Sequence, residues 1–209
     1  MRVMEDQTMV ALHQPDSAGF ILAAAAELFI GRGFERTSLQ AIATRAGVAK
    51  GLIGHYFQSK HGLLEAIVSE FYRRQHQVLR AAHDPCAPLH PRLAALLDAY
   101  FDFMTASHGY ARLVQQLVAH DDRVLKLSRR HLRVLHAWLE HEAFADIPTV
   151  HPAAARQVVL TLSGAVLAYF AVGPALPGLP CHETVDAHAE RRAHLHVLAK
   201  TLVRGLEEA

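Results

Sequence analysis

Residues 37–60 read TSLQAIATRAGVAKGLIGHYFQSK, in which two short runs with helical periodicity meet at Ala46-Gly47-Val48. Glycine supplies the positive φ that a tight turn between two helices needs. One face of each run is apolar, with Ile42 and Ile53 as expected core anchors. The other faces are polar and basic, so neither run is a fully buried helix. The stretch predicts a helix-turn-helix, a motif whose later helix lies in the DNA major groove.

Apolar residues recur every three or four positions along the whole chain, and no alternating strand pattern bounded by hairpin turns occurs. The sequence therefore predicts an all-α fold of about nine helices. A first helix follows Asp16 or Ser17, with Phe20 on its buried stripe, and Thr37 caps the second with Gln40 completing a capping box. Ser59 caps a long fourth helix whose buried stripe includes Val78. The remaining helices are expected at about 89–107, 109–119, 121–145, 152–172 and 184–206.

The basic residues that favour a polyanion are concentrated near the amino terminus. The net charge of the whole chain is +1, but residues 31–60 contain five basic residues and one acidic residue. Lys60, in the first turn of the fourth helix, is expected to bind a DNA phosphate, because that helix end also attracts anions. Tyr56, and Thr37 or Ser38, can donate hydroxyl hydrogen bonds to further phosphates.

Composition narrows the class of protein and its surroundings. Hydrophobic residues make up 51% of the chain and charged residues 20%, which indicates a folded, soluble protein without an uninterrupted membrane span. The first residues lack the pattern of an export leader, so we expect a cytoplasmic protein without membrane contact. Cys86 and Cys181 are interpreted as free thiols, and no metal or other cofactor is expected, although His83, Cys86 and His90 share one proline-rich loop.

The stretch LFIGRGFERTSLQAIATRAGVAKGLIGHYFQSKHGLLEAIV, residues 28–68, resembles the amino-terminal domain of the TetR family of transcriptional regulators. Within that family it is most similar to the choline-responsive, BetI-like branch, whose recognition helix also ends in His-Tyr-Phe. The resemblance implies a flexible arm at 1–15, a DNA-binding domain at 16–62 and a ligand-binding and dimerisation domain at 63–209.

By match to the family's reading positions, base contacts would come from the third helix and the start of the second. The residues are Gln40, Lys50, Gly51, Leu52 and His55. Lysine can pair with guanine, glutamine with adenine, and leucine can contact a thymine methyl group. Two positions depart from the family pattern: Gly54 replaces a frequent aromatic residue, and Ala49 lacks the usual capping hydroxyl. These departures bear on which DNA sequence is recognised.

The resemblance further implies that the second half binds a small effector and forms a homodimer through its last two helices. Apolar positions broad enough to serve a partner are Val158, Leu162, Val166, Leu195, Leu198 and Leu202. Aromatic walls for the effector are expected from Tyr100, Phe103, Tyr110, Trp138, Tyr169 and Phe170, with Asp98 or Asp102 supplying charge if they point inward. A cation held over aromatic rings would suit such a pocket, while a hydrophobic or aromatic molecule is the other possibility.

The sequence as a whole predicts a ligand-responsive regulator, a repressor released from a palindromic operator by its effector, and not an enzyme. No catalytic arrangement accompanies Ser163, since it does not follow a strand. Two alternatives stay open. The helix-turn-helix could be purely structural in a helical enzyme or carrier of small molecules, or it could bind another protein.

Overall fold

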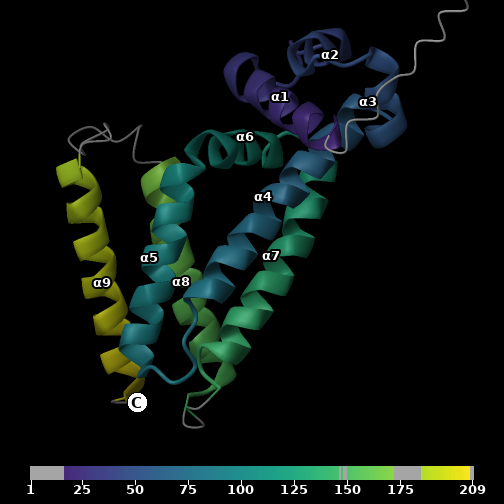
Figure 1. Ribbon diagram of the computed structural model, residues 1–209. Coiled ribbons are helices and arrows are strands. Elements are labelled where there is room, and N and C mark those ends of the chain that lie inside the picture. The colour runs from purple at the N-terminus through teal and green to yellow at the C-terminus, as the bar shows by residue number, and fades with distance from the viewer. Residues whose placement is uncertain (1–16, 146, 148–149, 172–184, 208–209) are drawn as a thin grey trace, which may run out of the picture. The chain divides into compact units, whose positions relative to one another are not determined.

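The computed structural model describes residues 17–145, 147, 150–171 and 185–207. In this part of the chain all regular structure is helical, which confirms the all-α prediction (Figure 1). The nine helices are α1 (Ser17–Arg32), α2 (Leu39–Ala46), α3 (Lys50–Phe57), α4 (Lys60–Ala82), α5 (Leu89–Ala106), α6 (His108–Val118), α7 (Asp122–Glu142), α8 (Pro152–Ala171) and α9 (Val185–Glu207). The predicted arm at 1–15 and Cys181 lie outside the described residues.

The chain divides into two compact units, and the division falls inside α4, between Leu63 and Leu64. In the first unit α1, α2 and α3 contact one another pairwise. Their shared core contains Ile21, Ile42 and Ile53, none of which is exposed to solvent. This core fixes the angle between α2 and α3, because both helices bury their single apolar stripe in it.

The second unit is a helical bundle in which α5, α8 and α9 pack side by side, while α7 packs against α6 and α8 (Figure 1). Its buried side chains include Phe101, Met104, Val124 and Leu195. Arg92 is also buried, and its guanidinium donates to the carbonyl oxygens of Pro85, Ala87 and Ala143 at 2.6–3.1 Å. This arginine ties the loop before α5 to the end of α7.

Helix α8 is the one described helix that is long and apolar enough, over Pro152–Phe170, to cross a membrane by length and composition alone. Arg156 and Gly164 interrupt this segment, so it does not contradict the prediction that no uninterrupted span occurs. One face of α8 is buried against α5, α6, α7 and α9, with Val158, Leu162 and Val166 in the interior. A core helix of a bundle has this character.

Two apolar residues predicted to be buried are exposed. Phe20, on α1, is 51% exposed, and Val78, on α4, is 37% exposed. Both lie at the edge of an apolar stripe, where periodicity does not decide whether a neighbouring helix covers the residue. Helix boundaries differ from the predicted ones by a few residues, as at α7, which ends at Glu142 instead of 145.

Candidate nucleic-acid interface and ligand cavity

Helix α2 is capped by Ser38, not by Thr37 as predicted. The Ser38 hydroxyl accepts a hydrogen bond from the Ala41 amide at 3.1 Å, and the backbone of Ser38 is extended. Thr37 is buried instead, and its hydroxyl donates to the carbonyl oxygens of Gly33 and Leu28. The capping box was therefore assigned one residue too early, and the Thr37 hydroxyl points into the core instead of toward a phosphate.

The turn from α2 to α3 has the geometry that the sequence predicts. Gly47 has a φ of 68°, in the left-handed region, and its amide bonds back to α2. The amide of Val48 donates to the Ala43 carbonyl at 3.0 Å, which closes the end of α2. Ala49 precedes α3 in an extended conformation and makes no side-chain cap, as expected from its missing hydroxyl.

The outer face of α3 carries few side chains. Lys50, Gly51, Gly54 and His55 are all exposed, whereas Ile53, on the inner side, is fully buried. A Cβ atom added at either glycine would meet nothing within 4 Å. The face therefore consists of one cation, one imidazole and bare backbone, and another molecule can approach this backbone closely.

The side chains flanking this face come from both ends of the motif. Leu52 and Tyr56 are half-buried, and the rings of His55 and Tyr56 lie 5.2 Å apart in an edge-to-face arrangement. On the α2 side, Ser38 and Gln40 line a shallow groove between α1 and α2, together with Arg32. The sequence interpretation did not include Arg32, although it is an exposed cation beside two of the predicted contacts.

Lys60 holds the first unit together from within. Its ammonium donates to three backbone carbonyl oxygens in the segment between α1 and α2, those of Phe34 at 2.8 Å, Thr37 at 3.1 Å and Glu35 at 3.3 Å. The same nitrogen lies 4.3 Å from the centre of the Phe34 ring. An ammonium has three N–H donors, and all three are used here. These contacts give Lys60 a structural role within the first unit, and its contact with a DNA phosphate stays a prediction.

The corner between α3 and α4 is unusually tight. Gln58 has a φ of 64°, which is rare for a residue other than glycine, and its amide bonds to the Gly54 carbonyl at 3.0 Å. Ser59 caps α4 as predicted, with its hydroxyl accepting from the Gly62 amide at 3.0 Å. A Cβ atom at Gly62 would overlap the carbonyl oxygen of Phe57. Only glycine fits at this position without movement of the backbone.

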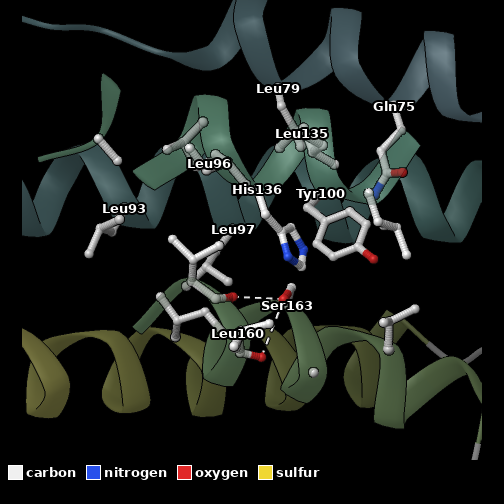
Figure 2. Close-up of a pocket in the computed structure, with 17 residues that line it drawn as sticks. Gln75, Leu79, Leu93, Leu96, Leu97, Tyr100, Leu135, His136, Leu160 and Ser163 are labelled. Carbon is white, nitrogen blue, oxygen red and sulfur yellow. Dashed lines mark hydrogen bonds between the residues drawn. The ribbon is translucent and has the colours of Figure 1, made fainter. Parts of the chain in front are cut away.

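The second unit encloses a cavity of about 240 Å³, which we call the leucine cavity because ten of its seventeen lining residues are leucines (Figure 2). Its polar lining groups are Gln75 on α4, Tyr100 on α5, His136 on α7 and Ser163 on α8. No lining residue is acidic, and none is lysine or arginine. The walls therefore favour an apolar and uncharged occupant.

The polar groups of the leucine cavity are neutral. Burial raises the pKa of the Tyr100 hydroxyl, and the neighbouring Gln75 side chain partly opposes this rise. Burial lowers the pKa of His136, so its imidazole is uncharged at neutral pH. Ser163 directs its hydroxyl to the Val159 carbonyl at 2.7 Å (Figure 2). The Oε1 atom of Gln75, in contrast, is buried without a hydrogen-bond partner.

A second cavity of about 220 Å³ adjoins the leucine cavity and shares Gln75, Tyr100, Leu132 and Leu167 with it. The two cavities therefore meet at the Gln75 and Tyr100 side chains. Each is smaller than the roughly 300–1,000 Å³ of typical small-molecule sites, and together they fall within that range.

Comparisons with known proteins agree with the first unit's geometry. Residues 21–67 match the model of the family described as bacterial regulatory proteins, tetR family. These residues, which include most of the first unit, therefore have the sequence of a tetR-family domain. The transcriptional regulator BetI of Yersinia pestis is 40% identical over 76 residues, which are 34% of this chain and 36% of that protein. BetI of Vibrio parahaemolyticus is 32% identical over 117 residues, covering 53% of this chain and 58% of the relative.

The chain thus spans about a third to somewhat over half of the length of these TetR-family relatives. A solved structure of a putative transcriptional regulator from Pseudomonas aeruginosa PAO1 extends the likeness to the whole fold. The two structures align with a TM-score of 0.73 and a sequence identity of 19%. The alignment covers 98% of this chain and 97% of that chain. The helical second unit therefore shares the fold of that solved structure.

Of the aromatic residues predicted to line an effector pocket, Tyr100 alone lines the two cavities. Phe103 packs on Phe71, Trp138 on His76 and His83, Tyr169 on His194, and Phe170 on Phe101, while Tyr110 is half-buried outside both cavities. Asp98 and Asp102 pair with Arg192 on α9 and do not line the cavities. The walls come from leucines, which the sequence interpretation treated as ordinary core.

The residues predicted for the dimer interface lie largely inside one chain. Val158, Leu162, Val166 and Leu195 are buried by other helices of the same subunit, and Leu198 and Leu202 are half-buried. The intramolecular core therefore accounts for the four buried residues, while an interface role for Leu198 and Leu202 stays a prediction. The exposed faces of α8 and α9 carry different residues, among them Leu160 and Val197.

In the described part of the chain, no group of three His, Cys, Asp or Glu side chains is arranged to hold a metal ion. Cys86 is exposed and is not in a disulfide. The candidate sites of this chain are therefore the face of α2 and α3 and the paired cavities of the second unit.

Proposed function

We propose that this protein is a transcriptional regulator that binds operator DNA through α2 and α3 and responds to a small molecule held in the leucine cavity. The observation that carries the proposal is the exposed, cationic and glycine-rich face of α3, set by a capped helix-turn-helix that matches the TetR family. Such a face fits the major groove closely. Repression relieved by the ligand is the mode of action we expect.

The proposed DNA contacts follow from exposure. Lys50, His55 and Gln40 are exposed and supply base-edge contacts, with Leu52 beside them and the backbone of Gly51 able to approach the DNA. Ser38 and Tyr56 are proposed to position the phosphates. We do not include Thr37 and Lys60 among the proposed DNA contacts, because their hydrogen-bond donors bind carbonyl oxygens inside the protein.

We further propose a homodimer formed by the exposed faces of α8 and α9. Leu160, Gly164 and Ala168 recur every four residues on the exposed side of α8, and Ala193, Val197 and Thr201 do so on α9. A twofold dimer would present two copies of α3 to half-sites about one DNA turn apart, or a multiple of that, hence a palindromic operator. Val197→Glu should then convert the dimer to monomers in sedimentation equilibrium.

The test selects bound duplexes from a random DNA pool and measures their affinity by fluorescence anisotropy at several salt concentrations. We expect a palindromic sequence whose affinity falls steeply with salt. Ligand binding with a coupling energy of about 1–3 kcal/mol would weaken it roughly 5–150-fold. A protein that ignores every duplex at low salt would not be a regulator of this kind, and the structural or protein-binding alternatives would then apply.

A further inference from the structure

The buried amide of Gln75 is the least satisfied polar group in the leucine cavity. The residue is only 3% exposed, and its Oε1 atom has no hydrogen-bond partner. The Gln75 side chain lines the cavity beside Tyr100. A buried acceptor left without a donor costs about 1–3 kcal/mol. The group is therefore set up to accept a hydrogen bond from a molecule in the cavity.

The rest of the cavity excludes charged ligands. A cation would find neither a carboxylate nor a cage of aromatic rings, because Tyr100 is the one phenol, indole or phenyl ring in the lining. Both aspartates on the nearby face of α5 are engaged with Arg192. An anion would place its oxygens against the unpartnered oxygen of Gln75, with no cation lining the leucine cavity.

Among the described side chains that line the leucine cavity, Gln75 alone has an oxygen that is buried without a hydrogen-bond partner. The Ser163 hydroxyl already donates to the Val159 carbonyl. His136 is neutral because burial lowers its pKa. The Gln75 side chain also lines the adjoining cavity, so a donor bound there can carry apolar parts into either space.

We propose that the leucine cavity binds an uncharged, mainly hydrocarbon molecule with a hydrogen-bond donor, an alcohol in the simplest case, whose donor binds Gln75 Oε1. This inference rests on the proposed function, since it names the ligand class for the cavity of that regulator. It excludes a quaternary ammonium ligand. The matches to the two BetI proteins cover 34% and 53% of this chain, whereas the proposal rests on the lining of this chain's own cavity.

The test measures binding to the purified, full-length protein by isothermal titration calorimetry with four probes. They are 1-octanol, heptyl methyl ether, octanoate and octyltrimethylammonium. The alcohol and the ether have the same number of non-hydrogen atoms, but only the alcohol has a donor. We expect 1-octanol to bind roughly 5–150-fold more tightly than the ether, which is the cost of an unsatisfied buried acceptor, and the two ions to bind more weakly still.

The variant Gln75→Leu removes the acceptor and should bring the alcohol and the ether to within about twofold of each other. Gln157→Leu, at an exposed position on α8, is the matched control and should keep the wild-type preference. The comparison of probes in the wild-type protein needs no variant, so it stands even if Gln75→Leu does not fold. Equal binding of alcohol and ether, tightest binding of an ion, or binding of none of the four overturns the proposal.

Because calorimetry does not involve DNA, the two proposals fail separately. Preference for the alcohol without duplex binding would overturn the proposed regulatory function and support the proposed ligand class. Duplex binding without preference for the alcohol would support the regulatory function and overturn the ligand class.

Discussion

Lys60 offers a direct comparison between a structural and a DNA-binding role. Its ammonium donates to three carbonyl oxygens and lies over the Phe34 ring. A hydrogen bond from a charged donor contributes about 1.5–3 kcal/mol when well buried. Lys60 is half-exposed, so we discount each bond to well under 1 kcal/mol for competition with water. Lys60→Met, which keeps the aliphatic stem, should then lower the free energy of unfolding by about 2 kcal/mol.

The matched control is Lys50→Met. Lys50 is exposed on the outer face of α3, and none of its described neighbours forms an ion pair with it. Surface changes of this kind usually alter stability by less than about 0.5 kcal/mol. If Lys50 contacts DNA, its loss should weaken operator binding and change base preference at one position.

The assay combines urea unfolding, followed by circular dichroism, with anisotropy titrations of operator DNA over a range of salt concentrations. A lost phosphate contact lowers the slope of log affinity against log salt by about 0.9 per subunit. We expect Lys60→Met to be less stable with an unchanged slope, at a temperature where it is fully folded. Unchanged stability together with a reduced slope would refute the structural role and restore Lys60 as a phosphate ligand.

Three further predictions concern stability in urea unfolding. Gly62→Ala should lower the free energy of unfolding by more than about 2 kcal/mol, because its Cβ would overlap the Phe57 carbonyl. Gly54→Ala, whose Cβ meets no other protein atom, should stabilise α3 by up to about 1 kcal/mol. Equal effects of the two changes would contradict the tight corner. Arg92→Leu should lower the free energy of unfolding by about 3 kcal/mol or more, since it leaves buried carbonyl oxygens unpartnered. A loss under about 0.5 kcal/mol would contradict the structural role of Arg92. A hydrogen bond from Arg73 lowers the pKa of the Glu70 carboxyl to about 2. Glu70→Gln should therefore lower the free energy of unfolding by about 0.5–1 kcal/mol at pH 7, and this difference should shrink as the pH falls from about 4.5 toward 2. A difference that does not depend on pH would contradict the pairing.

The periodicity of the chain predicted the order and type of the helices, because each helix buries one apolar stripe and the loops carry Gly and Pro. The sequence signals for the cap of α2 placed it one residue too early. Thr37 and Ser38 both suit a cap, and the choice between them depends on whether the Phe34 loop buries the first hydroxyl. That is a tertiary fact which no pattern over four residues contains.

The ends of long side chains were harder to predict than the helices that carry them. Lys60 is at the position expected for it, yet its ammonium turns to carbonyls more than twenty residues earlier in the chain. Similarly, leucines rather than aromatic rings line the cavity, since Trp138 and Phe103 are used in packing between helices. Exposure of α3 residues was predictable, because a short helix with one buried isoleucine leaves its other sides outward.

The corner at Gly62 has an evolutionary consequence. Any missense change in a glycine codon introduces a larger side chain, and the Phe57 carbonyl already occupies the space beside the Cα hydrogen atoms of Gly62. In a library of random variants selected for folding, this codon should therefore tolerate almost nothing, while side chains added at Gly51 and Gly54 meet no other protein atom. New DNA preferences can thus arise on the outer surface of α3 without disturbing the joint that holds it.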